Sequence, residues 1–537
     1  MAQGKLRKSL NLLDLTFLGL GAIIGSGWLF AAQAGAVMAG PGAWIAWVFG
    51  AVACMLIGLV YAELSSAWPR AGGIIRYPQY SHGSMVGFFM GFASLLAYSS
   101  VAGIEAQAVR QYASHYIPAL TVANSTTQNY TGLGLVFEIA FLVIFFLLNY
   151  FSVTVFGKVN TVVTALKFIM PFLTLVILLF NMHPSNFSVG GASPGGAHGI
   201  FSAISTAGIV FAFLGFRQAV DFAGEAKNPQ RTVPWAIILS ISLGALVYVL
   251  LQVAFVGAMP VKDLAHGWAS INFNAPFAQL AIAIGMQWLA LLLFADAVLS
   301  PAGTGNIYTG STSRVLFAWT RNGYFYSLFG KINARTGLPR PAIVLSFFLA
   351  VMWILPSNFH SWQGLVGAVT SATVMTYVYG PVSALAMRKS APDHPRVFRL
   401  GGMGIIAPLA FIAGTWIVYW TGWTIDSELI AMILGSLVLY FAFMDKGPDS
   451  IARMKRDWKS GIWVICYYLF IGVMTRIGSF GPMKHPVIPG PWVDSLVVAL
   501  GAIVFFYWGV ASRLKVPDFA TDDESDLSNH SVAVSEA

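Results

Sequence analysis

The stretch GLGAIIGSGWLF (residues 19–30) places four glycines and a serine in the middle of the first long apolar run. A bilayer core offers no water to an exposed backbone, so opening a helix there is costly. One interpretation is close helix packing on a GxxxG-type face made by Gly21 and Gly25. The other is a broken helix, which also accounts for Ser26 and Gly27 on other faces, because glycine leaves helical geometry at the lowest cost. Glycine content alone leaves both interpretations open.

The composition indicates an integral membrane protein of the all-α type. The 537 residues are 57% hydrophobic and only 9% charged, whereas a soluble domain is about 25% charged. The apolar runs do not alternate as barrel strands do. The net charge of +9 comes from basic residues scattered between these runs, which argues against a nucleic-acid partner. Cys54 and Cys466 lie outside any metal-binding spacing, so we expect neither a disulfide framework nor a metal site.

Runs of about 20 apolar residues are long enough to cross a bilayer, and about fourteen of them predict the spans. They lie at 14–38, 43–66, 84–112, 133–150, 154–181, 199–220, 234–258, 287–316, 341–356, 361–387, 404–421, 427–444, 461–477 and 493–511. The run at 276–286 is shorter and predicts a small external helix. Residues 1–13 form a cytoplasmic N-terminus, and the acidic tail 512–537 is expected to be disordered and cytoplasmic.

The placement of the 30 lysines and arginines predicts the orientation. With the N-terminus inside, most of them fall on interior segments, and the exterior segments hold only Arg110, Lys262, Arg476 and Lys484. Cytoplasmic loops carry this excess of positive charge. We therefore expect a multi-pass protein of the cell (inner) membrane with both termini cytoplasmic and an even number of spans.

A second interrupted apolar run helps to choose between the two interpretations of residues 19–30. In an inverted repeat of five spans, the partner of span 1 is span 6, which carries FAFLGFRQ (residues 211–218) at its middle. Paired interrupted helices at matching places in two halves are a sequence pointer to the central site of a transporter. This match favours the broken helix at residues 19–30.

Four motifs resemble the amino acid–polyamine–organocation (APC) superfamily of permeases. They are GAIIGSGWLF (21–30), YAELSSAWPRAGGIIRY (61–77), FAFLGFRQAVDFAGEAKNPQRTVPWAI (211–237), and SRVLFAWTRNGYF (313–325) followed by NARTGLPRPAIV (333–344). The resemblance runs through spans 1 to 12 in order, and spans 13 and 14 extend beyond the usual twelve. Some permeases of this general type are aspartate–proton symporters.

The resemblance implies a LeuT-like fold of five plus five spans with broken helices 1 and 6. The first repeat is expected at 14–181, the second at 199–387, and four additional spans at 404–511. In such a fold the substrate α-carboxylate meets backbone N–H groups, and its amino group meets freed carbonyls. The matching residues are Gly25, Ser26 and Gly27 for the carboxylate, Ile23, Phe211, Leu214 and Gly215 around the amino group, and Phe211 as an aromatic cover.

Lys167 stands inside the fifth span, in VVTALKFIMPFLTLVILL. A lysine near a span end can snorkel to the interface, but Lys167 is nine residues past Lys158, roughly 13 Å along a helix. The resemblance implies a coupling role, because sodium-independent relatives carry a lysine here where sodium-dependent ones bind Na⁺. Lys167 would be a proton carrier or a permanent sodium mimic, with Thr309 and Thr312 of span 8 facing it.

Arg217 departs from the family pattern, since many members have Gly-Phe-Glu where this chain has Gly-Phe-Arg. An arginine beside the break could form a bidentate pair with a second carboxylate, which favours aspartate or glutamate as substrate. The alternative is an ion pair with Asp221 or Glu225 that anchors the helix. The departure also puts in doubt any proton-handling role of the acidic residue that the family has there.

Glu63, Glu105, Glu138 and Asp296 are the other charged residues deep within spans, and charges there are functional candidates by default. Of these, Asp296 and Glu105 are the remaining candidates for the site. Either could join an ion pair or a proton relay. For Glu105, which is near Arg110 in sequence, structural pairing is the favoured interpretation.

The favoured function is secondary active transport, as proton-coupled symport of an amino acid, with an acidic substrate indicated by Arg217. The alternatives are an exchanger and a neutral amino acid or polyamine permease, and a channel or membrane sensor is less well supported. The nine histidines are dispersed and no P-loop is present, so no enzyme activity is expected. The expected partners are a small amino acid, H⁺ and the lipid bilayer, with no other cofactor. The sequence does not indicate the oligomeric state.

Overall fold

The computed structural model describes residues 10–70, 73–122, 129–151, 153–321, 323–333, 336, 338–356, 359–443, 448–488 and 490–519. Within these ranges the protein is helical and has no β-strand, only two isolated bridges. The all-α expectation is therefore confirmed for this part of the chain.

Each of the fourteen apolar runs contains at least one helix. Their bounds are α1 Leu12–Ile23, α2 Ser26–Ala39, α3 Ala43–Ala67, α5 Ser84–Ala113, α6 Gly132–Phe151, α7 Val153–Phe180, α8 Gly196–Thr206, α9 Arg217–Asp221, α10 Pro229–Ala258, α12 Gln287–Arg321, α13 Arg340–Ile354, α14 Trp362–Tyr377, α15 Tyr379–Ser390, α16 Met403–Thr421, α17 Trp423–Gly435, α18 Leu437–Phe443, α19 Pro448–Ile477 and α20 Pro491–Ala511. Two short helices join them, α4 Gly73–His82 and α11 Pro276–Ala283. The helix α11 confirms the short helix predicted at 276–286.

Eleven helical segments among the described residues are long and apolar enough to cross a membrane. One of them joins α2 to α3, and three shorter apolar helices, including α1 and α13, lie outside this count. A multi-pass helical protein is thus confirmed, while the exact number of fourteen spans stays a prediction.

The first predicted break is present. The helix α1 ends at Ile23 and α2 begins at Ser26, with Ile24 and Gly25 out of helical geometry between them. Gly25 uses its own N–H in a 3.0 Å bond to the Ile23 carbonyl. Ser26 and Gly27 therefore form the first turn of α2, where backbone N–H groups have no partner inside the helix.

The second break is also present, but it begins earlier than predicted. The helix α8 ends at Thr206, and Gly208 has φ +85°, a backbone conformation that glycine adopts without steric cost. The predicted interruption at residues 211–218 is instead a 3₁₀ segment, η4 Phe211–Phe216, followed directly by α9. The interruption was therefore predicted on the 3₁₀ segment, whereas helical geometry ends before it, at Gly208.

The two broken segments pack directly against each other. A Cβ on Gly215 would lie 2.4 Å from the Ala22 carbonyl carbon and from the Ile23 nitrogen, and a Cβ on Gly27 would lie 2.9 Å from that of Ala212. Both glycines therefore allow backbones to approach where a side chain would not fit. Packing and breaking, which the sequence offered as alternatives, occur together in this stretch.

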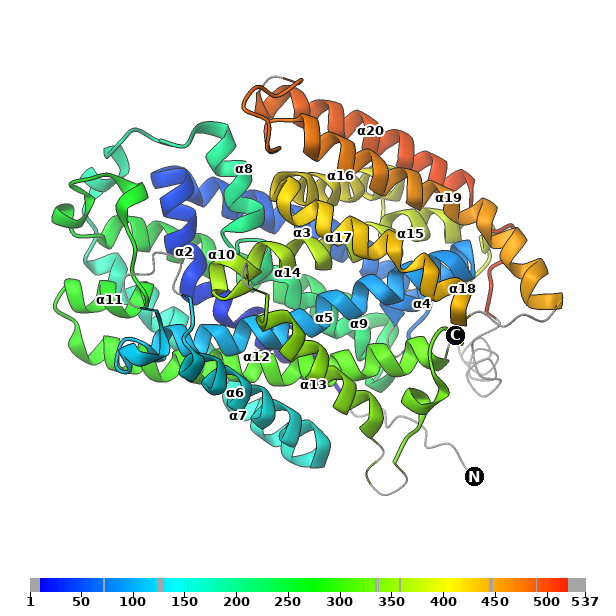
Figure 1. Cartoon of the computed structure of the whole chain (residues 1–537), viewed down its shortest axis with the longest axis horizontal. Helices are drawn as coiled ribbons and strands as arrows, with labels where there is room; N and C mark the ends of the chain where they lie inside the picture. Colours follow the sequence, from blue (N-terminus) through cyan, green and yellow to red (C-terminus); the bar gives the residue numbers. More distant parts are fainter. Residues whose placement is uncertain are drawn as a thin grey trace.

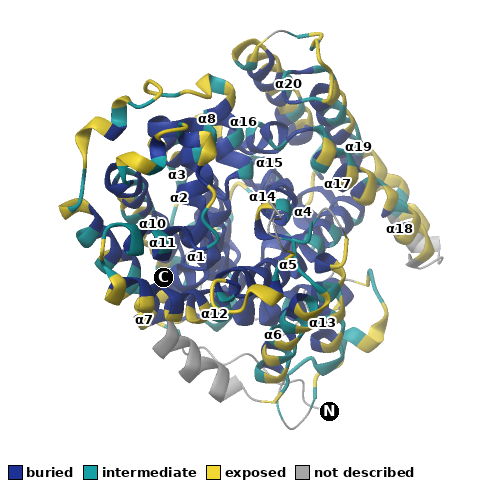
Figure 2. Cartoon of the chain, turned by 60° about the vertical axis from the view of Figure 1, so that its left-hand side comes forward, coloured by how far each residue is buried: buried dark blue, intermediate teal, exposed yellow. Residues whose placement is uncertain are grey.

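The paired breaks lie in the buried interior. Figure 2 shows α1, α2 and α14 mostly buried at the centre, with exposed residues on the outer helices. Leu246 of α10, Leu291 of α12 and Val504 of α20 are among the large exposed apolar residues, as a lipid-facing surface requires. The two breaks therefore lie away from this apolar outer surface.

The last two long helices, α19 and α20, lie along one flank of the molecule (Figure 1) and pack on α16. The first residues of the tail predicted to be disordered continue inward, where Leu514 N–H donates to the Ser81 carbonyl (2.8 Å) and Asp518 N–H to that of Tyr80 (3.0 Å). Residues 1–9 and 520–537, which hold most of both predicted terminal segments, lie outside the described residues.

Candidate functional site

A carboxylate occupies the N-terminus of α2. The Ser26 N–H donates to Glu105 Oε2 of α5 over 2.9 Å, and both residues are fully buried. A helix N-terminus presents free N–H groups and a positive dipole end, so it is suited to bind an anion. The donor expected for the substrate α-carboxylate is thus already bound to a carboxylate of the protein.

Glu105 does not pair with Arg110, its charged neighbour in sequence. Arg110 Nε lies 2.5 Å from Glu138 Oε1 of α6, with both side chains fully buried. The second oxygen of Glu105, Oε1, has no hydrogen-bond partner in the described part of the chain. It lies 2.7 Å from the position of a Cβ on Gly25, so the carboxylate faces the break itself.

The Lys167 ammonium lies on the other side of the break. Its Nζ donates to the Gly21 carbonyl near the end of α1 (2.9 Å) and to Thr304 Oγ1 of α12 (2.8 Å), and the side chain is buried. Lys167 therefore does not snorkel to an interface in this structure. A cation at a helix C-terminus is favourably placed in the helix dipole.

Thr304, rather than Thr309 or Thr312, is the threonine that bonds to Lys167. The hydroxyls of Thr309 and Thr312 bond to carbonyls of their own helix. The Thr304 hydroxyl lies 3.1 Å from the Gly21 carbonyl and 3.4 Å from that of Ile24. It also lies 2.8 Å from the position of a Cβ on Gly25. Thr304 thus joins the lysine side of the break to the Glu105 side.

Asp296 lies on the same helix as Thr304, but outside this cluster. Both of its carboxylate oxygens are 2.9 Å from Ser300 Oγ, and the side chain is buried. Eight residues separate it from Thr304, roughly 12 Å along α12. Its hydrogen bonds are to Ser300 of its own helix, and it reaches Lys167 only through a longer-range electrostatic interaction.

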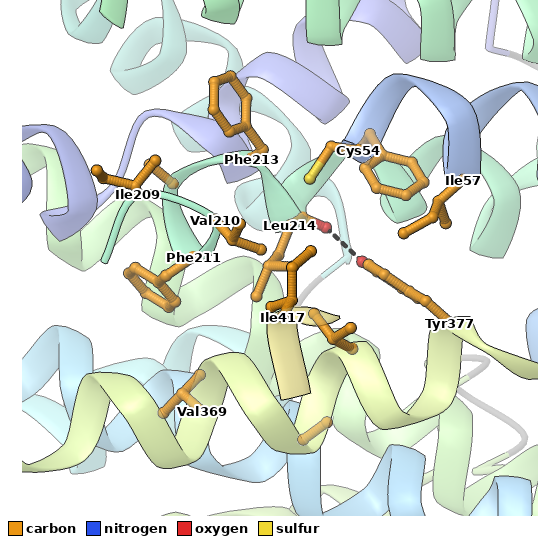
Figure 3. Packing of buried hydrophobic residues seen from close by; sticks show 14 of the residues in the cluster. Cys54, Ile57, Ile209, Val210, Phe211, Phe213, Leu214, Val369, Tyr377 and Ile417 are labelled. Carbon is orange, nitrogen blue, oxygen red and sulfur yellow. Dashed lines mark hydrogen bonds between the residues drawn. The ribbon is translucent and has the colours of Figure 1, made fainter. Parts of the chain in front are cut away.

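Two carbonyls expected to hold a substrate ammonium already accept hydrogen bonds from tyrosines. The Ile23 carbonyl accepts from Tyr248 of α10, and the Leu214 carbonyl accepts from Tyr377 of α14, each over 2.9 Å. Figure 3 shows Tyr377 reaching the Leu214 oxygen amid packed apolar side chains such as Ile57. Sequence reasoning missed both tyrosines, because nothing local to either one indicates its partner helix.

Phe211 and a second aromatic residue lie beside the α2 terminus. The Phe211 ring meets Trp362 of α14 edge to face, with centroids 6.1 Å apart. Trp362 Nε1 donates to Ser26 Oγ over 2.8 Å. Trp362 is therefore a further residue of the site that sequence reasoning missed, and its position at the start of α14 gave no signal.

Arg217 is fully buried in an aromatic cage. Its guanidinium carbon lies 3.7 Å from the ring centroid of Tyr98 and 5.3 Å from that of Tyr377. Its Nη1 donates to Thr376 Oγ1 over 3.4 Å. Within the described residues, Nε and Nη2 have no hydrogen-bond partner. A buried guanidinium with two unused donors can receive an anion, since leaving buried donors unpaired is costly.

The alternative role of Arg217, an ion pair with Asp221 or Glu225 that anchors the helix, has only weak support from the distances. Arg217 Nε lies 3.9 Å from Asp221 Oδ2, too long for a hydrogen bond. That same oxygen accepts a bond from the Tyr98 hydroxyl. Glu225 pairs instead with Arg314, at 3.8 Å. Asp221 contributes a nearby negative charge, but it does not use the free donors of the guanidinium.

No group of three or more His, Cys, Asp or Glu side chains that could hold a metal ion is found in the described ranges. The polar groups at the breaks are a lysine, a glutamate, hydroxyls and backbone amides. This set suits a ligand with its own carboxylate and ammonium groups.

Comparison with known proteins gives concordant matches. A family model described as amino acid permease matches residues 10–501. The aspartate-proton symporter of Bacillus subtilis (strain 168) is 43% identical over 522 residues, covering 97% of this chain and 99% of that protein. The glutamate/serine transporter AimA of the same organism is 41% identical over 521 residues, covering 95% and 94%.

Among solved structures, the manganese transporter mutant H236A of Eremococcus coleocola aligns with a TM-score of 0.48 at 14% identity, covering 86% of this chain and 94% of that chain. A similarity at this level carries no conclusion about the cargo of this chain.

Proposed function

Because the chain belongs to the amino acid permease family, we propose that it is a secondary active symporter that carries acidic amino acids together with protons. The family makes it a multi-pass membrane transporter of amino acids. The acidic side chain of the cargo, the coupling ion and the residues that bind them are the content of the proposal.

The observation that carries the proposal is the bond between Ser26 N–H and the Glu105 carboxylate. It supports a carboxylate site at the N-terminus of α2, on which the substrate α-carboxylate would replace Glu105. The substrate ammonium would then lie near the Leu214 carbonyl, which accepts one bond from Tyr377 and keeps a second lone pair. The Ile23 carbonyl accepts two bonds, from Tyr248 and from the Gly25 N–H, so it would have to release one of them.

The acidic side chain is supported by Arg217. Tyr98, which lies under the guanidinium, and Glu105, which holds Ser26, are seven residues apart on α5. This is two helical turns, roughly 10 Å, on nearly the same face. A substrate bound at Ser26 could therefore direct a side-chain carboxylate toward the two free donors of Arg217. A substrate with an apolar side chain would leave those donors unpaired and bind less well.

Proton coupling follows from competition at Ser26. When an anionic substrate takes the Ser26 N–H, the displaced Glu105 carboxylate would remain buried beside another carboxylate. Two like charges cannot comfortably share such a site, so Glu105 would bind a proton as the substrate binds. The Lys167 ammonium stays against the end of α1 and steadies the break. Asp296 has no contact that assigns it a step in this scheme.

Aspartate carries one net negative charge at neutral pH, so co-transport with one proton moves no net charge. Symport would still concentrate the substrate by using the pH gradient. The glutamate/serine relative makes serine the neutral competitor to test first, and an exchanger remains the alternative mode.

The test is uptake of radiolabelled L-aspartate by the full-length protein in proteoliposomes. An inward proton gradient should drive accumulation above equilibrium, and a protonophore should abolish it. Unlabelled glutamate should compete better than serine or lysine. Uptake that only equilibrates, or that needs internal amino acid, would replace symport with facilitated diffusion or exchange, and stronger competition by serine than by glutamate would overturn the acidic specificity.

The proposed architecture is the LeuT-like inverted repeat of 14–181 and 199–387, followed by the additional spans in 404–511, with both termini cytoplasmic. It is supported by the two breaks, which lie in the first span of each proposed repeat. The distribution of lysine and arginine supports the orientation. Labelling of cysteines introduced at each end of the chain, from each side of the membrane, tests it.

A further inference from the structure

We propose that Trp362 is the lid that closes the α2 side of the substrate site, an inference that rests on the function proposed above. Trp362 is the first residue of α14, and its indole is fully buried. The Nε1–H group donates to Ser26 Oγ over 2.8 Å. Ser26 therefore donates its backbone N–H to the Glu105 carboxylate and accepts the indole N–H with its hydroxyl oxygen.

The indole contacts both broken segments at once. On the α2 side it stacks on Phe30, with ring centroids 4.8 Å apart and planes 23° apart. On the other side it meets Phe211 of η4 edge to face. A Cβ on Gly208 would lie 2.5 Å from Trp362 Cη2, so the tip of the indole fills the space that the missing side chain leaves. Trp362 thus bridges the two segments that would hold the substrate.

Different residues lie on the two sides of the first break. Lys167 and Thr304 contact the end of α1, whereas Trp362 and Phe30 lie along the beginning of α2. The indole bonds the hydroxyl of the residue whose backbone N–H would bind the substrate. The indole must therefore give up its bond to Ser26 and its stack on Phe30 before that side can open.

The residues leading into the lid are fixed to other helices. The His360 carbonyl accepts a bond from Arg110 Nη2 (3.2 Å), and Arg110 is paired with Glu138. Ser361 caps α14 by accepting from Gly364 N–H (3.2 Å). These contacts place the lid on a held segment, so its movement is a rotation of the indole or a shift of the first turn of α14, and not a motion of a free loop.

The opposite end of α14 closes the other side. Tyr377 bonds to the Leu214 carbonyl and lies beside Arg217. It is fifteen residues from Trp362, roughly 22 Å along the helix. One helix therefore carries a closing side chain on each side of the paired breaks. Release of Trp362 while Tyr377 holds would open the site toward the α2 side only.

Two measurements on the purified full-length protein test the lid. The variant Trp362→Phe keeps an aromatic ring but loses the N–H donor. Loss of one buried hydrogen bond predicts about fivefold faster release of radiolabelled L-aspartate. It also predicts faster hydrogen–deuterium exchange in a peptide covering residues 24–31 without any substrate. Tyr377→Phe is the matched control, because it loses one hydroxyl at the other end and should leave exchange in that peptide unchanged.

Ser26→Ala is the second variant and should reproduce both effects with Trp362 in place, because it removes the hydroxyl that accepts the indole N–H and keeps the backbone N–H. If the wild-type protein does not bind aspartate, the proposed substrate is wrong. The hydrogen–deuterium exchange measurement, which needs no substrate, then still tests the role of Trp362 as a lid. If the wild-type binds aspartate and both variants leave release and exchange unchanged, the lid is overturned. If Trp362→Phe does not fold, Ser26→Ala gives the decision alone.

Discussion

Replacement of Arg217 should reduce transport of acidic amino acids far more than that of neutral ones. Two of its donors, Nε and Nη2, have no partner within the described residues, and in our proposal they bind the substrate side-chain carboxylate. A hydrogen bond to a charged group contributes about 1.5–3 kcal/mol. Loss of both in Arg217→Met should cost about 3 kcal/mol or more, which is roughly a 100-fold fall in kcat/KM for aspartate.

The variant Arg217→Lys separates charge from geometry. A lysine keeps the positive charge but cannot form the two parallel bonds of a guanidinium. We expect it to recover about half of the lost free energy, so that its kcat/KM for aspartate lies roughly tenfold below the wild type.

The assay is the initial rate of uptake of radiolabelled aspartate and of radiolabelled serine in proteoliposomes, with the amount of folded protein measured for each variant. Arg314→Lys is the matched control, because Arg314 forms a partly exposed pair with Glu225 at 3.8 Å. Such a pair contributes about 1 kcal/mol or less. Arg314→Lys should therefore leave the ratio of aspartate to serine uptake unchanged.

Arg217→Met should change that ratio and not merely lower both rates. An equal fall for aspartate and serine in Arg217→Met would show that Arg217 only supports the fold. Full aspartate uptake in the same variant would remove it from the site altogether.

Three further predictions concern the break itself. Glu105→Gln keeps an acceptor for the Ser26 N–H but cannot exchange a proton. Accumulation driven by a pH gradient should therefore be lost, while exchange of labelled for unlabelled aspartate persists. Retained accumulation would exclude Glu105 from coupling. Lys167→Ala removes the ammonium that steadies the end of α1, so accumulation and exchange should fall together. Unchanged accumulation at every pH would remove Lys167 from the mechanism. Gly215→Ala would place a methyl group 2.4 Å from the Ala22 backbone, so we expect the melting temperature to fall by several degrees, and an unchanged value would show that the two segments can separate freely.

The helical architecture and the place of the first break could be predicted because their causes are local. Apolar runs of about 20 residues form helices wherever no water can bond the backbone. The glycines of residues 19–30 mark the point where helical geometry is given up most cheaply. The short helix at 276–286 could be read for a similar reason, from a proline followed by a brief apolar run. Lys167 and Arg217 could be singled out because a charge inside a span is costly.

The partners of these residues could not be predicted, because they come from helices distant in sequence and depend on how those helices are rotated. Thr304 and Thr309 lie on the same helix, and only the packing of α12 against α1 selects Thr304 to face Lys167. The pairing of Glu105 with Ser26 depends in the same way on the packing of α5.

The sequence by itself therefore determined the class of the protein, the apolar segments that form its helices and the residues whose burial needs a reason. The tertiary structure decided what those residues contact: a carboxylate on the N-terminus of α2, tyrosines on the buried carbonyls of Ile23 and Leu214, and Trp362 over Ser26. The physical reason is that backbone geometry and hydropathy act over a few residues, whereas a hydrogen bond between two helices exists only once their rotation and depth are fixed by packing along their whole length.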